Sequence, residues 1–271
     1  MDGGLATLLA LADSRLPTGG HVHSGGVEEA VTSGLVTDVV TLRAYLRRRI
    51  RTQGLVTASI AAAVHSGLDP VVADRETDAR TPAPAARQAS RAQGRGLLRL
   101  ARRVWPETDW VPLGTRPHLA VASGVVGRVS GLDPERTCAT VVYTTMSGSA
   151  TAAQRLLALD PADVAALTFE LSGLCDATAA EAANGIADLS DPLLDVLAQR
   201  HAGTAARQGD AQDLGQSFAG EPQSGRISQR HQALVVQPTD PVRSPCADRT
   251  RHRRLSSWKR HDAEGSNDSK S

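Results

Sequence analysis

The sequence predicts an all-α protein, and three observations support this fold class. Before residue 202 the dipeptide Asp-Pro occurs four times. Each pair is typical of a helix start, because Asp accepts hydrogen bonds from free first-turn amides and Pro has no amide to satisfy. Glycines follow the apolar stretches, where a residue in the left-handed conformation would end a helix. Apolar residues also recur at steps of three and four, as in Val164, Leu167 and Leu171.

The expected helices follow from these signals. The Asp-Pro pairs that open four of them begin at Asp69, Asp133, Asp160 and Asp191. The glycines that end four of them are Gly34, Gly67, Gly131 and Gly185. The helix before Gly67 has Leu42, Leu46 and Ile50 on one face and a candidate break at Gly54. In chain order, the expected helices cover 4–12, 26–34, 38–66, 69–78, 84–104, 116–127, 134–159, 161–184 and 191–200.

One segment, Thr140 to Thr145, favours a strand by composition because it is β-branched and aromatic. A single strand would leave its backbone groups unpaired, and no second run alternates with a period of two. We therefore keep this segment inside the expected helix 134–159.

The chain divides into two unlike parts near residue 201. It has 271 residues, with 30 Lys+Arg against 29 Asp+Glu and a formal net charge of +1. Residues 1–201 contain no lysine, whereas residues 202–271 hold both lysines and 26 Gly, Pro, Ser and Gln among 70 residues. We expect 1–201 to form a single helical domain of about eight to nine helices. We expect 202–271 to be a disordered tail, because it has too little apolar surface to offset the entropy of ordering.

Several classes of protein are excluded or disfavoured. No apolar run approaches the ~20 residues that span a bilayer, and acidic Asp2 does not fit a signal peptide, so we expect a cytoplasmic protein without membrane contact. Three widely spaced cysteines predict neither disulfides nor a zinc site. Phosphate-binding and nucleophile-elbow motifs are missing, so we do not expect an enzyme. His65 and His118 have no ligand-spaced neighbour and are interpreted as surface or capping residues.

The most unusual stretch is the glycine-rich loop between the first two expected helices, residues 13–29. His21 and His23 could chelate nickel or zinc, but two ligands alone make a weak site. Alternatively, Asp13 and Ser24 cap the flanking helices and the two histidines pack against them.

Three segments in order carry a family resemblance: LLALADSRLPTGGHVHSGGVE at 8–28, RQASRAQGRGLLRLA at 87–101 and GSATAAQRLLA at 148–158. They resemble the N-terminal signature, a helix with paired leucines and the late helix of the UreF urease accessory proteins. The resemblance covers residues 5–201. The chain looks like an actinobacterial-type variant, with His21 and His23 where the family has aromatic residues and with an atypical C-terminal extension.

The resemblance implies an all-α, non-enzymatic protein that acts as a scaffold and checkpoint in nickel insertion into apo-urease. It implies binding to UreD (also called UreH), recruitment of the GTPase UreG and a homodimer within the complex. It also implies that nickel is handled by the complex, so we expect no tightly bound cofactor. Among residues that match the family pattern, the candidates for partner binding are Arg155, Glu28, Ser24 and Pro17.

Two alternatives stay open at this point. The chain could be a small nickel-binding protein or a metal-dependent enzyme that uses His21 and His23. The basic segment 249–260 could contact nucleic acid, but interspersed carboxylates dilute its charge, so nucleic acid is not an expected partner.

Overall fold

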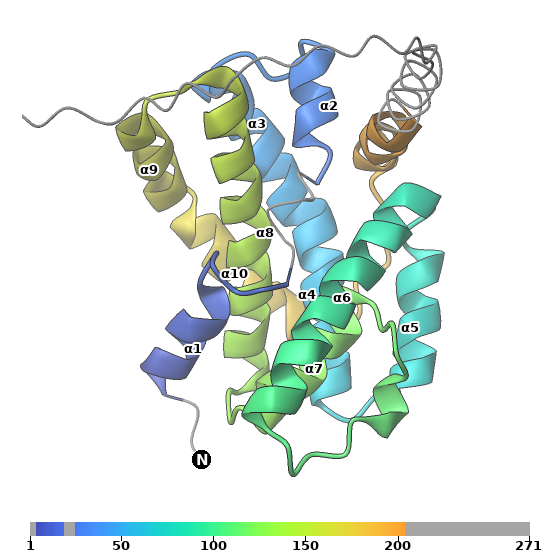
Figure 1. The fold of residues 1–271 in the computed structure, drawn as a ribbon. Coiled ribbons are helices and arrows are strands. Elements are labelled where there is room, and N and C mark those ends of the chain that lie inside the picture. The colour runs from blue at the N-terminus through green and yellow to red at the C-terminus, as the bar shows by residue number, and fades with distance from the viewer. Residues whose placement is uncertain (1–3, 19–24, 204–271) are drawn as a thin grey trace, which may run out of the picture. The chain divides into compact units, whose positions relative to one another are not determined.

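The computed structural model describes residues 4–18 and 25–203 (Figure 1). The predicted tail, apart from its first two residues, lies outside the described residues. So do Ser24, His21 and His23. Within the described ranges every regular element is helical, which confirms the all-α prediction. No helix in these ranges is long and apolar enough to cross a membrane.

Ten α-helices have defined bounds, where about eight to nine helices were expected. They are α1 (Leu5–Ala12), α2 (Val27–Thr32), α3 (Val39–Arg49), α4 (Leu55–His65), α5 (Pro70–Ala79), α6 (Pro84–Val104), α7 (Leu119–Val129), α8 (Pro134–Leu157), α9 (Pro161–Glu170) and α10 (Ser172–Ala182). Two short elements join them, a π-helical turn η2 (Ile50–Gly54) and a 3-10 turn η3 (Val111–Leu113). A further helical stretch covers 192–203.

Two predicted helices are divided in the structure. The expected helix 38–66 becomes α3, η2 and α4, and the wider π-helical turn ends at Gly54, where the break was expected. The expected helix 161–184 divides at Leu171 into α9 and α10. Leu171 is buried at this division, which helical periodicity alone does not reveal.

The helix starts agree with the Asp-Pro signals. Asp69, Asp133 and Asp160 each accept a hydrogen bond from a first-turn amide of the helix that follows. The segment Thr140–Thr145 is helical within α8, as expected. Its threonine hydroxyls donate to backbone carbonyls three or four residues earlier, for example Thr145 Oγ1 to the carbonyl of Val141 at 2.8 Å. These bonds satisfy the hydroxyls inside the helix, so β-branched composition does not force a strand here.

The core forms two clusters that meet along α4. One joins α2, α3, α8, α9 and α10 around residues such as Leu46, Ile50 and Met146. The other joins α4, α6 and α7 around Ile60 and Val121. Because aromatic residues make up only 3% of the chain, close packing depends on small side chains at the helix crossings.

Candidate functional site

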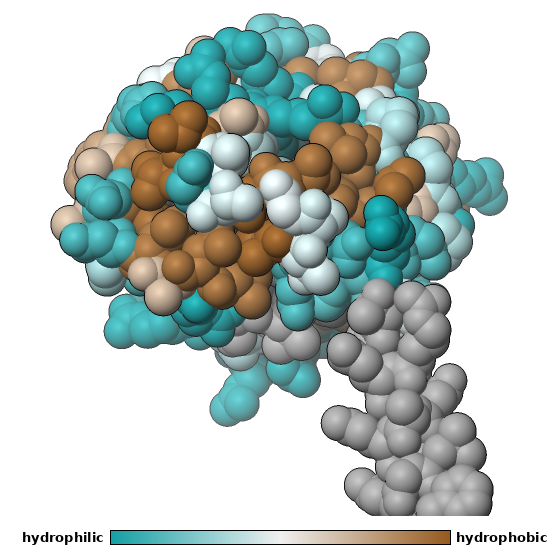
Figure 2. Space-filling view, turned by 90° about the horizontal axis from the view of Figure 1, so that it is seen from above, coloured by the Kyte–Doolittle hydropathy of each residue, from teal (hydrophilic) through white to brown (hydrophobic). Residues whose placement is uncertain are grey.

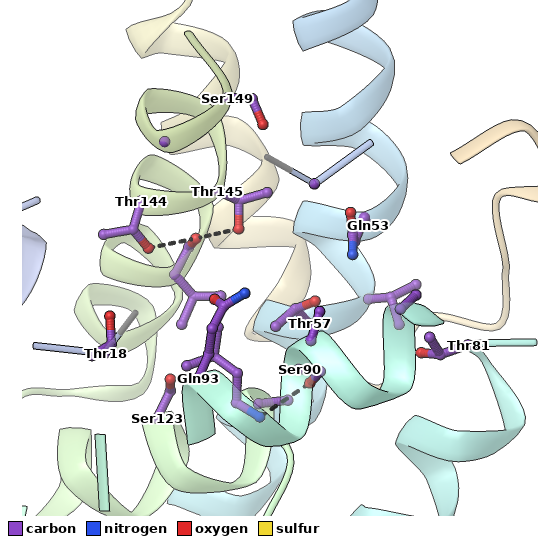
Figure 3. A pocket seen from close by; sticks show the side chains of 18 of the residues that line it. Thr18, Gln53, Thr57, Thr81, Ser90, Gln93, Ser123, Thr144, Thr145 and Ser149 are labelled. Atoms are coloured by element: carbon purple, nitrogen blue, oxygen red, sulfur yellow. Dashed lines mark hydrogen bonds between the residues drawn. The ribbon is translucent and has the colours of Figure 1, made fainter. Parts of the chain in front are cut away.

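A cavity of about 1100 Å³ lies among the helices and is lined from α4, α6, α7 and α8 and from both described ends of the loop between α1 and α2 (Figure 3). Neutral hydroxyl and amide groups supply much of its polar lining. The labelled ones in Figure 3 are Thr18, Gln53, Thr57, Thr81, Ser90, Gln93, Ser123, Thr144, Thr145 and Ser149. Such groups offer hydrogen bonds to water or to a small polar ligand.

Carboxylates in the cavity lining are already engaged. Asp13 pairs with Arg15, and the hydrogen bond from this guanidinium lowers the pKa of Asp13 to about 2. Asp191 binds Arg48, and Asp195 accepts a bond from the amide of Ala83. The lining is therefore better suited to water or to a weakly held polar ligand than to a tightly held metal ion.

The three segments that carry the family resemblance converge on this cavity. Thr18 and Gly25 come from the first segment, Ser90 and Gln93 from the second, and Arg155 from the third. Thr18 also packs directly against α6. This close contact is possible because Gly96 has no side chain, and a Cβ there would lie 2.9 Å from the Cα of Thr18. Segments separated by some 60 residues in the sequence thus form one site.

The C-terminal end of the loop is held by α3. The carbonyl oxygen of Gly25 accepts hydrogen bonds from the Tyr45 hydroxyl at 2.9 Å and from Arg49 Nη1 at 2.6 Å. Arg49 is buried and also donates to Gln53. Burial raises the pKa of Tyr45, so its hydroxyl stays protonated as a donor. Gly25 has a φ of +66°, a conformation that favours glycine.

Glu28 lies where α2 meets the last helical stretch. Its carboxylate is 3.6 Å from His201 Nε2, and the neighbouring Glu29 is 3.2 Å from Arg200 Nε. Gly26 lets the two elements approach closely, since a Cβ there would lie 3.3 Å from the Cβ of Leu197. Glu28 therefore joins two parts of this chain, and its predicted role in partner binding stays a prediction.

The other two described candidates are exposed. Arg155 lies near the C-terminal end of α8, lines the cavity and forms no ion pair with any residue in the described ranges. Pro17 lies in the turn after α1 and points to solvent. The structure does not bring Arg155 into contact with Glu28, but His201, whose Nε2 lies 3.6 Å from Glu28, lines the same cavity as Arg155. Ser24 lies outside the described residues.

The end of the bundle where α3 begins and α8 ends presents a broad hydrophobic area bordered by hydrophilic side chains (Figure 2). Exposed leucines at this end include Leu35, with 51% of its surface exposed, and Leu156, with 45%. Exposed apolar area of this kind is typical of surfaces that bind another protein.

One buried polar cluster was not predicted from the sequence. His118 stands at the N-cap position of α7, but it is fully buried and its side chain makes no cap bond, so the interpretation as a surface histidine was wrong. Its Nε2 lies 2.9 Å from Asp78 Oδ1, and its Nδ1 lies 3.0 Å from the Ser90 hydroxyl. Its partners come from α5 and α6, so nothing adjacent in the sequence reveals them. The available signal was the pair Asp74 and Asp78, four residues apart on the predicted helix 69–78.

Among the described residues, Asp74, Asp78 and His118 form a group whose ligand atoms lie within 4.8 Å of one another. Arg91 Nη2 already lies 2.8 Å from Asp74 and 2.9 Å from Asp78. Burial lowers the pKa of His118, so the ring is neutral near pH 7 and Arg91 supplies the balancing charge. A cation would have to displace this guanidinium, and we interpret the cluster as a structural link between α5, α6 and α7.

Two further potential ligands, Cys138 and Cys175, are free and buried. Burial raises the pKa of Cys138 to about 12 and that of Cys175 to about 11. Both thiols stay protonated near pH 7, and a protonated thiol is a poor nucleophile and a poor metal ligand.

The His118 cluster predicts an acid-sensitive contribution to stability. Because the pKa of His118 is lowered below its usual 6.5, the unfolded chain takes up this proton first as the pH falls. The stabilisation is therefore present above pH 6.5 and decreases below it. We expect His118→Gln to flatten the loss of unfolding free energy between about pH 7 and about pH 5, a range that lies above the carboxylate titrations.

Urea denaturation at the two pH values measures this effect. His65→Gln is the matched control, because His65 is partly exposed and, among the described residues, its ring binds only the carbonyl of Leu132. An equal pH dependence in wild type and His118→Gln would contradict the prediction.

Comparison with known proteins agrees with the three-segment resemblance. Residues 36–172 match the family model UreF. The urease accessory protein UreF of Mycolicibacterium vanbaalenii is 77% identical over 201 residues, which covers 73% of this chain and 94% of that protein. The proteins of the same name from Mycobacterium sp. (strain JLS) and Mycobacterium marinum are 78% and 73% identical, with the same coverage.

These names confirm the expectation of an accessory protein rather than an enzyme. About a quarter of this chain has no counterpart in the alignments, whereas nearly the whole of each relative is matched. A family match over half of the chain and relatives at this identity settle the affiliation: the chain belongs to the UreF family of urease accessory proteins.

Proposed function

We propose that this protein is a scaffold in urease maturation, which binds UreD (UreH), recruits the GTPase UreG and assists nickel insertion into apo-urease in the cytoplasm. In this proposal the protein acts as a homodimer within the complex and holds no tightly bound cofactor. The observation that carries the proposal is the convergence of all three family segments on one polar cavity.

The surface of the domain supports a role in assembly. The apolar end of the bundle in Figure 2 offers area that a partner protein can bury. Arg155, exposed beside the cavity, offers a guanidinium for a carboxylate or phosphate group of a bound partner. Glu28 contributes indirectly, because it connects the first family segment, residues 8–28 (the signature segment), to the helical stretch 192–203 that borders the cavity.

The alternative, a nickel-binding protein or metal-dependent enzyme, relies on His21 and His23. Both histidines lie outside the described residues. The described residues contain one group that could hold a metal ion, Asp74, Asp78 and His118, and Arg91 already binds its carboxylates. Nothing in the described part of the chain favours this alternative.

Complementation tests the proposed function. In a strain that lacks its own UreF, we expect the full chain and a version that ends after residue 203 to restore urease activity to similar levels. The reason is that the shorter version keeps the cavity lining and the Arg200 and His201 contacts.

Urease activity in cell extracts and co-purification of tagged chain with UreD and UreG give the readouts. An Arg155→Glu variant provides a comparison in which the fold is kept but one cavity charge is reversed. The proposal fails if neither version restores activity and neither co-purifies with UreD.

A further inference from the structure

The helix α6 carries an unusual charge pattern. Its 21 residues include six arginines and no acidic residue. Five of these arginines are spaced four residues apart and form one ridge along the helix; they are Arg87, Arg91, Arg95, Arg99 and Arg103. Like charges at this spacing cost roughly 0.2–0.5 kcal/mol per pair in an isolated helix, so folding alone does not favour the pattern.

The first half of the ridge already binds an acidic helix within this chain. Arg91 Nη2 lies 2.8 Å from Asp74 and 2.9 Å from Asp78, and Arg87 Nε lies 3.8 Å from Asp78. Asp74 and Asp78 are themselves four residues apart on α5. Arg91 thus bridges both carboxylates of α5, and Arg87 adds a longer contact to one of them.

The second half of the ridge has no such partner in the described ranges. Arg95, Arg99 and Arg103 are exposed and form no ion pair with any described residue. Arg103 lies in the last turn, where it interacts favourably with the helix dipole, but Arg95 and Arg99 lie too far from the end for this explanation. Their buried neighbours Gly94 and Gly96 face the protein, which directs these arginines outward.

We propose that Arg95, Arg99 and Arg103, which we call the α6 arginine ridge, bind a helix of a partner protein that carries Asp or Glu residues four positions apart. The docking of α5 on Arg87 and Arg91 is the precedent within the same helix. Guanidinium groups suit this role because they bind carboxylates in a bidentate geometry.

The surroundings of the ridge favour a protein over a nucleic acid. Val104, next to Arg103, is 52% exposed, and apolar area beside a charged ridge fits a protein interface. The inference rests on the proposed function for its choice of partner, an acidic helix of UreD, UreG or apo-urease.

Binding measurements with the full chain test the ridge. The variant combines Arg95→Gln, Arg99→Gln and Arg103→Gln. The matched control combines Arg47→Gln, Arg51→Gln and Arg128→Gln. These three arginines lie elsewhere in the domain, are exposed and form no ion pair with a described residue. The probes are UreD, UreG and apo-urease of the same organism, each alone, and a short duplex DNA.

We expect the ridge variant to bind one protein probe about tenfold more weakly at ~50 mM NaCl, with the difference shrinking at ~500 mM because salt screens ion pairs. The control variant should lose less than about threefold in affinity for the same probe. The unfolding temperature of the ridge variant should not fall, because the substitutions remove repulsion within α6.

Crosslinking identifies the chemistry of the bound surface. Residues 1–201 contain no lysine, so Arg99→Lys adds the first side-chain amine of this region. A carbodiimide then joins this amine to a carboxylate in contact with it. We expect a partner peptide in which two acidic residues are four positions apart, and no such product from Arg128→Lys.

The outcomes separate the two proposals. If the wild-type chain binds a protein probe and the ridge variant binds it equally well, the ridge inference is wrong and the proposed function stands. If the wild-type chain binds none of the three proteins, the proposed function is wrong and the inference falls with it. A selective loss of DNA binding would overturn the choice of an acidic helix as partner.

Discussion

Replacing Asp191 by alanine is expected to lower the free energy of unfolding by about 3 kcal/mol. Asp191 is 6% exposed and links the last helical stretch to α3 and η2. Its carboxylate accepts bonds from Arg48 Nη2 and Thr52 Oγ1, each at 2.8 Å, and from the amides of Leu193 and Leu194. Alanine would remove the helix cap and leave the guanidinium and hydroxyl without these bonds.

The pKa of Asp191 reflects both its burial and these hydrogen bonds. Burial alone would raise this pKa, but the hydrogen bonds from Arg48 and Thr52 outweigh burial and lower it below 3.8. The carboxylate is therefore charged under physiological conditions, and its loss removes a complete ion pair.

Asp160→Ala is the matched control, because Asp160 also precedes a proline but is exposed and caps only its own helix. We expect this control to lose about 1 kcal/mol. Urea denaturation of both variants measures the difference. Equal losses would mean that Asp191 acts only as a cap and does not fasten the last helical stretch.

The fold was largely predictable because its boundaries are set by local signals. The predicted range 84–104 matches α6 at both ends, and Pro84 in the first turn gives the reason. The break at Gly54 was expected, but its π-helical form over Ile50–Gly54 and the division at Leu171 were not, because each depends on which neighbouring helix a residue packs against.

The site was predictable only in parts. The segments that line the cavity could be recognised in the sequence, but nothing in their residues indicates that they meet. The contacts that bring them together join distant residues, such as Arg48 and Asp191, 143 positions apart. The same reason explains why His118 was misinterpreted, since its partner Asp78 is 40 positions away. Helical periodicity describes one element at a time and contains no information on such pairs.

Replacing Gly96 by valine is expected to reduce urease activation at least about tenfold while the fold stays intact. A Cβ at position 96 would lie 2.9 Å from both the Cα and the carbonyl oxygen of Thr18. Backbone atoms cannot move aside as a flexible side chain can, so either α6 or the signature segment must shift. The ion pairs of Arg91 with α5 hold α6, and the segment that contains Thr18 should therefore be displaced from the cavity.

Gly173→Val is the matched control, because Gly173 is also helical and a Cβ there meets nothing within 4 Å. Complementation in a strain that lacks its own UreF measures activation, and thermal unfolding shows whether both variants fold. We expect similar unfolding temperatures and a loss of activation in Gly96→Val alone, because only this substitution moves the signature segment. Full activation by Gly96→Val would show that the position of Thr18 on α6 is unimportant, and a collapse of its unfolding temperature would show that this contact serves the fold. The outcome thus separates a segment that binds partners from one that merely closes the domain.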